Sequence, residues 1–317
     1  MKIKRYSTVT LNRSGFGDRV KRDFIRNKWI YLMLVPVILY FAVFCYVPMY
    51  GAIIAFKNYN VAKGIIGSDW AGFKWFTQFF TSYQFPRLMK NTLLLSFQNI
   101  IWGFPMPIIF ALLINEIRNN FFKRTVQTIT YLPHFISMVV VCSLIRIAVA
   151  EGGFVTSFLA MFGVENTNLL ARPENFRTIY IVSGIWQEVG WGTIIYLSAL
   201  TAIDPSLYEA ARIDGAGKWR QTLHITIPGI LPTIVIMLIL RIGQLMGIGY
   251  EKVMLLESPI IRETSDIIST YVYRVGLLEG GQYSYTTAIG LFNSLINVIL
   301  LVTANRVSNK LSGQGLW

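Results

Sequence analysis

The stretch WIYLMLVPVILYFAVFCYVPMYGAIIAF, residues 29–56, contains no acidic residue, lysine or arginine. A helix needs about 20 apolar residues to cross the hydrocarbon core of a bilayer, because each backbone N–H and C=O must find its partner within the segment. The stretch is too long for the apolar core of a secretory signal, and it lacks a small-residue cleavage site. We therefore expect it to remain in the mature protein as a membrane-spanning helix.

Five further apolar blocks of similar length follow along the chain. Charged residues inside them are limited to Arg146, Glu188, Arg241 and Arg306. The whole chain has 54% hydrophobic and 14% charged residues, whereas soluble domains carry about 25% charged residues. The sequence therefore predicts an all-α integral membrane fold with six transmembrane helices, at about 29–56, 91–115, 125–147, 178–203, 225–250 and 285–307.

The distribution of lysine and arginine predicts the orientation of these helices, since positively charged flanks are retained in the cytoplasm. The basic tail 1–28 contains nine such residues, and with the alternate connections its side of the membrane has 17, against nine on the other side. We therefore expect both termini in the cytoplasm. The net charge of +13 then reflects topology and contact with anionic lipid of the inner leaflet. No nucleic-acid partner is expected, because no basic segment is interleaved with stacking aromatic residues.

The chain lacks the patterns of an enzyme. The segment GAGKW at 215–219 is not a P-loop, because Arg212 and Trp219 occupy the positions of its first glycine and of its Ser or Thr. No Ser, His and carboxylate set follows a recognisable elbow. We expect no catalytic residue, no metal and no cofactor, and we interpret His134 as a packing histidine. The remaining possible ligands form no zinc or haem cluster; they are His224, Cys45 and Cys142.

The connection between the fourth and fifth predicted helices reads DPSLYEAARIDGAGKW, residues 204–219. Asp204 is suited to cap a helix and Pro205 fits the first helical position, so a short helix is expected to begin here. Gly215 then allows a sharp turn that residues with a Cβ tolerate poorly. Residues 218–226 are expected to form a second short helix, and Pro228 marks the entry into the fifth span. The sequence therefore predicts a helix, a glycine turn and a helix.

This loop resembles the EAA loop of permease subunits of binding-protein-dependent ABC importers. The matching pattern is Glu209-Ala210-Ala211, three residues, Gly215, nine residues, Ile225, one residue and Ile227-Pro228. Ile227 departs from the usual leucine. The continuation Asp214-Gly215-Ala216 is similar to the carbohydrate-importing branch, including the maltose permeases, although the extra N-terminal spans and large outer domain of the enteric maltose permease are absent.

Further motifs extend the resemblance across nearly the whole chain. Together they look like the subgroup that imports oligosaccharides released from plant or algal polysaccharides. The motifs are Tyr46-Val47-Pro48-Met49-Tyr50-Gly51, Asn91-Thr92-Leu93, Tyr131-Leu132-Pro133 and Trp186-Gln187-Glu188-Val189-Gly190-Trp191-Gly192.

The resemblance implies a division of the chain and a set of partners. It implies a permease domain at 29–311 and an EAA coupling loop at 204–228, which sits in a cleft of a cytoplasmic ATPase. The ATPase pair binds ATP and Mg, and closure of the pair moves the spans between inward-open and outward-open states. The other implied partners are a second related permease and an extracytoplasmic sugar-binding protein. The residues implied in coupling to the ATPase are Glu209, Ala210, Ala211, Asp214 and Gly215.

Polar residues inside spans are costly, and they usually face a cavity or one another. Aromatic rings and amides suit sugars, so the fourth-span cluster is a candidate substrate path; packing between helices is an equally good interpretation. The candidates are Trp186, Gln187, Glu188, Trp191, Arg241, Gln244, Asn293 and Asn297, with Gln98 and Asn99 in the second span. Gly243 and Gly247 allow close helix approach, either to a second permease or within the subunit.

The charges inside the spans favour an acidic cargo, since Arg146 and Arg241 face only Glu188. A uronate oligosaccharide, such as an alginate or pectin fragment, would supply the missing negative charge. A carboxylate of the partner permease, or an interfacial position of Arg146, would explain the same count. The sequence leaves three other functions open: a permease for a peptide or amino acid, an ion-coupled sugar carrier, and a membrane scaffold that transports nothing.

Overall fold

The computed structural model describes residues 16–317, most of which are helical. Residues 1–15, about half of the predicted basic tail 1–28, lie outside the described residues. Strands in the described part are limited to a short antiparallel pair, β1 Lys57–Asn58 and β2 Asp69–Trp70. The predicted all-α class is therefore confirmed. The chain divides into two compact units, Met1–Ile53 and Ile54–Trp317.

The first unit is a helical arm. It contains α1 Phe16–Arg26, α2 Lys28–Tyr40, the π-helical turn η1 Phe41–Tyr46 and α3 Val47–Met49, followed by the 3-10 segment η2 Tyr50–Phe56. At the junction of α1 and α2, the Asp23 carboxylate accepts hydrogen bonds from Asn27 Nδ2 at 2.7 Å and from the Tyr31 hydroxyl. None of the side chains of α2 is buried. A helix that is apolar all round is typical of a membrane span.

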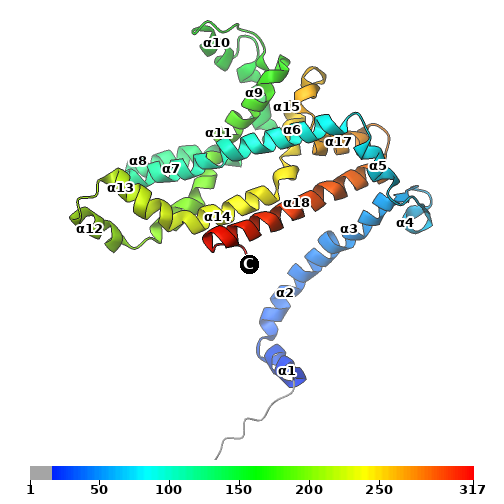
Figure 1. The fold of residues 1–317 in the computed structure, drawn as a ribbon, viewed down its shortest axis with the longest axis horizontal. Coiled ribbons are helices and arrows are strands. Elements are labelled where there is room, and N and C mark those ends of the chain that lie inside the picture. The colour runs from blue at the N-terminus through cyan, green and yellow to red at the C-terminus, as the bar shows by residue number, and fades with distance from the viewer. Residues whose placement is uncertain (1–15) are drawn as a thin grey trace, which may run out of the picture. The chain divides into compact units, whose positions relative to one another are not determined.

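Eleven helical elements of the second unit come from the apolar blocks and from the loop between the fourth and fifth of them (Figure 1). They are α6 Phe85–Gln98, the π turn η3 Asn99–Gly103, α7 Pro105–Glu116, α8 Asn120–Tyr131, α9 Met138–Val149, α11 Phe176–Thr201, α12 Pro205–Ile213, α13 Lys218–Gln221, the π turn η7 Thr222–Thr226, α14 Ile227–Gly243 and α18 Tyr283–Ser312.

Other elements connect these helices. They are α4 Gly64–Gly67, α5 Lys74–Phe80, η4 Leu132–Phe135, α10 Phe154–Ala160, η5 Leu169–Ala171, η6 Pro173–Asn175, η8 Leu245–Gly247, α15 Tyr250–Leu256, η9 Pro259–Ile261, α16 Arg262–Ser265, α17 Ile268–Tyr273 and η10 Arg274–Leu278.

Five helical segments of the described chain are long and apolar enough to cross a membrane. They are Lys28–Phe56, Phe85–Glu116, Met138–Ala160, Lys218–Gly243 and Tyr283–Lys310. Helix α11, which corresponds to the predicted fourth span 178–203, is not among them. Its 26 residues reach about 39 Å, but Gln187 and Glu188 make it more polar than the others. The number of six spans stays a prediction.

The predicted third span, 125–147, is interrupted. Helix α8 ends at Tyr131, a 3-10 turn follows at η4, and α9 begins at Met138. Pro133 has no N–H for a continuing helix, and the Ser137 side chain accepts from the Val140 N–H at 3.4 Å, which caps the new helix. The apolar segment therefore continues as α9 and α10 rather than ending at residue 147.

The predicted fifth span, 225–250, ends early. The helix begins with α13 at Lys218 and stops at Gly243, after which the backbone turns through η8. A Cβ at Gly243 would lie 2.6 Å from Leu301 Cδ1, so the absence of a side chain lets α14 approach α18. This contact lies within the subunit, which is one of the two roles expected for this glycine. Gly247 lies near Asn297 of α18.

Close packing on two sides fixes helix α11. Its most extensive contacts are with α7 and α8, while α14 packs along α18. At Gly190 a Cβ would come within 2.1 Å of the Thr130 carbonyl oxygen, and at Gly192 within 3.1 Å of Pro107. Tyr196 and Leu200 continue this interface into a buried cluster with Ala111 of α7. The two glycines of the WQEVGWG motif therefore place α11 against α7 and α8.

Candidate functional site

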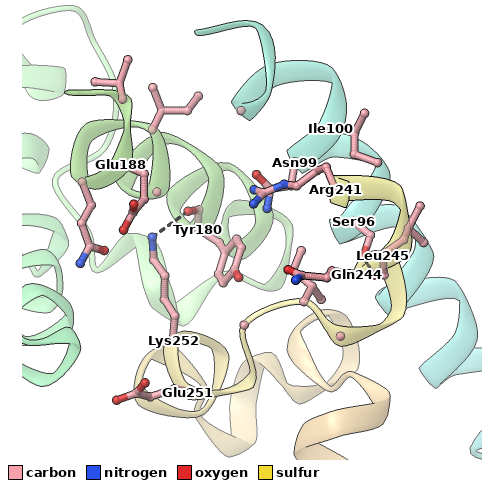
Figure 2. A pocket seen from close by; sticks show the side chains of 18 of the residues that line it. Ser96, Asn99, Ile100, Tyr180, Glu188, Arg241, Gln244, Leu245, Glu251 and Lys252 are labelled. Atoms are coloured by element: carbon pink, nitrogen blue, oxygen red, sulfur yellow. Dashed lines mark hydrogen bonds between the residues drawn. The ribbon is translucent and has the colours of Figure 1, made fainter. Parts of the chain in front are cut away.

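A cavity of about 280 Å³ lies where α14 ends. Most of its lining comes from α6 and η3, from the middle of α11, and from the chain between Arg241 and Lys252 (Figure 2). Pro107 of α7 and Met138 of α9 complete the lining. No single segment forms the cavity, since these parts are separated by up to about 150 residues in the sequence. The cavity is concave and has several polar groups around it, which is the usual character of a small-molecule site.

The break between α14 and α15 creates one wall of the cavity. Three side chains bind the irregular backbone of this break: Asn297 Oδ1 accepts from Met246 N–H at 2.9 Å, Asn293 Nδ2 donates to the Met246 carbonyl at 3.1 Å, and Ser96 Oγ donates to the Leu245 carbonyl. Irregular backbone at membrane depth is tolerated where protein or a cavity covers it. Asn293 and Asn297 therefore hold the break open, and neither lines this cavity.

Four of the predicted path residues do line the cavity: Gln187, Glu188, Arg241 and Gln244. Asn99, one of the two second-span candidates, also lines it. The Arg241 guanidinium, which lines the cavity, has no hydrogen bond or ion pair with any other residue that the structure describes. Its five N–H donors are therefore available to water or to a bound group. The path role of these residues stays a prediction.

The tryptophans of the fourth-span cluster lie outside this cavity. Trp191 stacks on the imidazole of His134, with ring centroids 4.4 Å apart and planes 3° apart, so one face of its indole is already covered. His134 Nδ1 also lies 3.0 Å from Glu188 Oε2. His134 therefore packs, as expected, and in addition pairs with a cavity residue. Trp186 is 48% exposed and keeps its ring free.

Lys252 is a charged cavity residue that sequence reasoning missed, as it also missed Glu251. It is only 5% exposed, its Nζ donates to the Tyr180 carbonyl at 3.1 Å, and it lies 5.0 Å from the centre of the Tyr180 ring. Burial lowers the pKa of Lys252 to about 8. The sequence places Lys252 among the outer-loop charges, but the early end of α14 brings it back against α11, where Gly184 leaves room for it.

These positions change the charge count that was expected from the sequence. The cavity has two cations, Arg241 and Lys252, and two carboxylates, Glu188 and Glu251; in Figure 2 the Glu251 side chain points away from Arg241. Arg146 is elsewhere, because its guanidinium donates to the carbonyls of Leu255 and Glu257 at 2.8 and 3.0 Å. The cavity therefore has as many carboxylates as cations, and the expected excess of positive charge is not found there. The Arg241 guanidinium nevertheless remains unpaired.

The segment between α11 and α14 has the predicted first helix and glycine turn, but the second helix is not a separate short one, because α13 and η7 continue into α14 as a single helical segment, Lys218–Gly243. Asp204 Oδ1 accepts from Ser206 N–H at 2.9 Å at the start of α12, and this bond lowers the pKa of the Asp204 carboxyl. Gly215 has φ +75° and terminates the helix. The Ala216 N–H then donates to the Ala211 carbonyl at 2.8 Å, and Gln221 Nε2 donates to the Ala216 carbonyl at 2.7 Å. The turn is thus held by a backbone hydrogen bond and by the side chain of Gln221.

The predicted coupling residues share the outer surface of this loop. Glu209, Ala210, Asp214 and Gly215 are exposed and Ala211 is half-buried. Beside them, Ile213 is 87% and Trp219 is 79% exposed. Apolar residues this exposed at the tip of a loop are typical of a contact surface. The role of these residues in coupling stays a prediction.

Asn91 and Thr92 make long-range contacts that the sequence did not predict. Asn91 Nδ2 donates to the carbonyls of Glu263 and Asp266 at 2.8 and 3.0 Å, and Thr92 Oγ1 accepts from Ile268 N–H at 3.0 Å. The two residues therefore fasten the segment 263–268 to α6. That segment precedes α17 and lies more than 170 residues along the chain, so no local pattern connects the two.

Known proteins resemble this chain over most of its length. A family described as binding-protein-dependent transport system inner membrane component matches residues 103–313. The polygalacturonan/rhamnogalacturonan transport system permease protein YteP of Bacillus subtilis (strain 168) is 47% identical over 294 residues, which cover 92% of this chain and 91% of that protein.

Two solved structures are similar as well, each 42% identical to this chain. One is a bacterial ABC transporter involved in the import of the acidic polysaccharide alginate, with a TM-score of 0.85 over 93% of this chain and 99% of that one. The other is a bacterial alginate ABC transporter in complex with an alginate pentasaccharide-bound periplasmic protein, with a TM-score of 0.86 over 94% and 100%. The chain therefore belongs to the family of binding-protein-dependent transport system inner membrane components and is a permease of an ABC importer.

Proposed function

We propose that this permease carries an acidic oligosaccharide of the uronate class across the inner membrane into the cytoplasm. The observation that carries the proposal is the cavity at the end of α14, where the Arg241 guanidinium has no partner among the described residues and Lys252 lies on the opposite wall. Guanidinium groups bind carboxylates through two parallel hydrogen bonds. The relatives support the same substrate class, since they are named for the transport of polygalacturonan and alginate.

The proposed topology has six spans with both termini in the cytoplasm. Helix α11 is the remaining span, because its 26 residues are long enough and its polar residues face the cavity rather than lipid. The permease domain is then 29–311, following a basic tail at 1–28. This topology places the loop 204–228 at the inner membrane face and the segments 57–84 and 250–282 at the outer face.

The loop 204–228 is proposed to couple transport to ATP hydrolysis. Glu209, Ala210, Ala211, Asp214 and Gly215 would sit in a cleft of an ATPase subunit, and the exposed Ile213 and Trp219 would widen that contact. The docked loop moves the spans only if its contacts with the ATPase differ in free energy between the inward-open and outward-open states. Because the turn is fixed by internal hydrogen bonds, a pull on α12 is transmitted directly to α13 and α14.

The proposed transporter complex includes several partner subunits. They are a second related permease, two cytoplasmic ATPase subunits that bind ATP and Mg, and an extracytoplasmic sugar-binding protein that delivers the oligosaccharide. The solved relative in complex with a periplasmic protein supports the last of these. In this assembly the chain contributes the pathway and the coupling loop, and it contributes no catalytic group, metal or cofactor.

Uptake into proteoliposomes tests the proposal. The permease is reconstituted with its partner permease, ATPases and binding protein, and ATP hydrolysis and uptake are measured with trigalacturonate, an alginate trimer and neutral maltotriose. We expect the acidic trimers to stimulate both activities and maltotriose to stimulate neither. Stimulation by maltotriose alone would contradict the uronate class, and uptake without ATP would contradict the importer mechanism.

A further inference from the structure

A second cavity, of about 470 Å³, opens on the face that the proposed topology turns outward. Its lining comes from the connection between α5 and α6, from the start of α6, from the segment between α16 and η10, and from the start of α18. It shares no lining residue with the cavity at the end of α14. It is therefore a separate site in the same unit of the chain.

Three arginines line this cavity: Arg87, Arg262 and Arg274. One carboxylate, Glu279, lines it with them and is 57% exposed in its side chain. The other two acids of the cluster lie behind the arginines. Asp266 is fully buried and Glu257 has a side chain that is only 14% exposed, and neither lines the cavity. The accessible surface of the site therefore has more guanidinium than carboxylate groups.

The buried acids hold the guanidinium groups in place. Asp266 Oδ2 lies 2.7 Å from Arg274 and 3.3 Å from Arg87, and Glu257 Oε1 lies 3.7 Å from Arg274 and 3.9 Å from Arg262. Each arginine has five N–H donors, more than these contacts use. Arg274 Nε also lies 3.6 Å from Glu279 Oε1, and Arg87 donates to Gln84 Oε1. The side chain of Arg262 is 37% exposed and makes no hydrogen bond with any residue that the structure describes. The acids therefore hold the guanidinium groups in place, and Arg262 keeps donors for a ligand.

The rest of the lining is suited to a sugar. It includes the phenol groups of Tyr83, Tyr271 and Tyr285, of which Tyr83 is 86% exposed at the rim. Tyrosines offer a flat apolar face and a polar hydroxyl, and amides offer both donors and acceptors for sugar hydroxyls. Three glutamines provide such amides: Gln78, Gln84 and Gln282.

We infer that this outer cavity binds the carboxylate of a uronate unit of the oligosaccharide before the sugar enters the path. The inference rests on the proposed function for the substrate class and for the side of the membrane. Arg262 is the residue most available to the ligand, since its nearest acid is 3.9 Å away and its side chain is 37% exposed. An acidic side chain of the binding protein is the rival occupant. The concave lining of tyrosine and glutamine favours the sugar, because a docking side chain needs no such walls.

Binding of trigalacturonate to the purified transport complex, without binding protein, tests the inference by calorimetry. The variant is Arg262→Gln, and the matched control is Arg172→Gln, an outer arginine that is paired with Glu165 and lines neither cavity. We expect Arg262→Gln to raise the Kd for trigalacturonate about tenfold and Arg172→Gln to leave it unchanged. An unchanged Kd in Arg262→Gln, or equal changes in both variants, would overturn the inference.

A second variant guards against misfolding. Tyr83→Ala removes a ring that is 86% exposed and whose hydroxyl accepts one exposed hydrogen bond, from Gln84 Nε2 at 2.9 Å. It is expected to raise the same Kd with unchanged thermal melting, and an unchanged Kd would count against the site. Stimulation of ATP hydrolysis by the binding protein distinguishes the sugar from the rival occupant, an acidic side chain of the binding protein. If Arg262→Gln weakens stimulation equally with trigalacturonate and maltotriose, the cavity is a protein contact and the inference fails.

Failure of the proposed function has a different signature. In that case the wild-type complex would not take up trigalacturonate in proteoliposomes, whatever the calorimetry shows. The inference is decided by the ratio of Kd between Arg262→Gln and wild type, which requires binding but no transport.

Discussion

The loop 204–226 and the cavity at the end of α14 are built in opposite ways. The loop is contiguous, and its cap, its turn and its second helix are each specified by a residue within a few positions, such as Asp204 and Gly215. The cavity is assembled mainly from three distant stretches of the chain, and its shape depends on where α14 stops and how closely α11 approaches α8. The local structure of the loop can therefore be predicted from the sequence, whereas the structure of the cavity depends on tertiary packing. Variants of the two regions should fail in different ways.

The largest effect is expected in the loop, at Gly215. Its φ of +75° is unfavourable for a β-branched residue, by on the order of 1–2 kcal/mol. Gly215→Val is expected to reorient α12 relative to α13. Because a small misplacement of a functional group can cost about 100-fold in rate, ATP-driven uptake is expected to fall about 100-fold. Binding of trigalacturonate should be retained. The matched control is Gly217→Ala, because Gly217 has φ −67° and open space around its Cβ position; equal uptake by the two variants would show that the turn is not needed.

The next effect concerns the placement of α11. A Cβ at Gly190 would lie 2.1 Å from the Thr130 carbonyl oxygen, so Gly190→Ala forces α11 away from α8 and is expected to destabilise the permease by about 1–3 kcal/mol. Thermal melting in detergent measures the loss. Gly290→Ala in α18 is the control, since nothing lies within 4 Å of its Cβ position. If both variants melt alike, the close approach of α8 and α11 is not what positions the cavity.

A change at Lys252 should alter selectivity without affecting the loop. Lys252→Met is expected to lower trigalacturonate uptake about tenfold, because a charge-assisted hydrogen bond to the carboxylate is worth about 1.5–3 kcal/mol. Association with the ATPase should be unchanged, as judged by co-purification. An equal loss of uptake for every cargo that the wild type carries would indicate a structural role for Lys252 instead.

The same residue predicts a pH dependence with a definite sign. Since the pKa of Lys252 is lowered to about 8, the side chain is charged below that pH and neutral above it. Uptake of trigalacturonate should therefore fall as the pH rises from 7 to 9, through about 8. Lys252→Arg, which keeps its charge, should remove this fall. A profile that is identical in wild type and Lys252→Arg would contradict the assignment.

The smallest effect is expected for the ion pair between Lys218 and Glu116. The two groups are 2.8 Å apart, with side chains 59% and 48% exposed, and surface pairs contribute about 0–1 kcal/mol. Glu116→Gln should change neither melting nor uptake measurably. A clear loss of uptake would show that the loop depends on contacts outside its own backbone, and would weaken the contrast with the cavity.

These two regions also show how far the sequence alone could predict the structure. The apolar blocks were recognised because lipid requires long uncharged helices, and five of them overlap helical segments that meet that requirement. The break at Pro133 and the early end at Gly243 were missed, because both segments stay apolar where the helix stops. Hydropathy reports the solvent around a segment and is insensitive to the continuity of its backbone.

The site residues were predicted with the same limits. Gln187, Glu188, Arg241 and Gln244 meet at one cavity because polar groups in a span must face something other than lipid. Lys252 could not be found this way, since it lies beyond the predicted span and becomes buried only through the fold.

Cysteine accessibility of the loop tests the central claim most directly. Ala210→Cys is introduced into a chain in which Cys45 and Cys142 are replaced by alanine, and a membrane-impermeant maleimide is applied to right-side-out and inside-out vesicles. The account predicts labelling in inside-out vesicles alone, and protection of the cysteine when the ATPase subunits are bound. Labelling from the outside, or labelling that bound ATPase leaves unchanged, would contradict it.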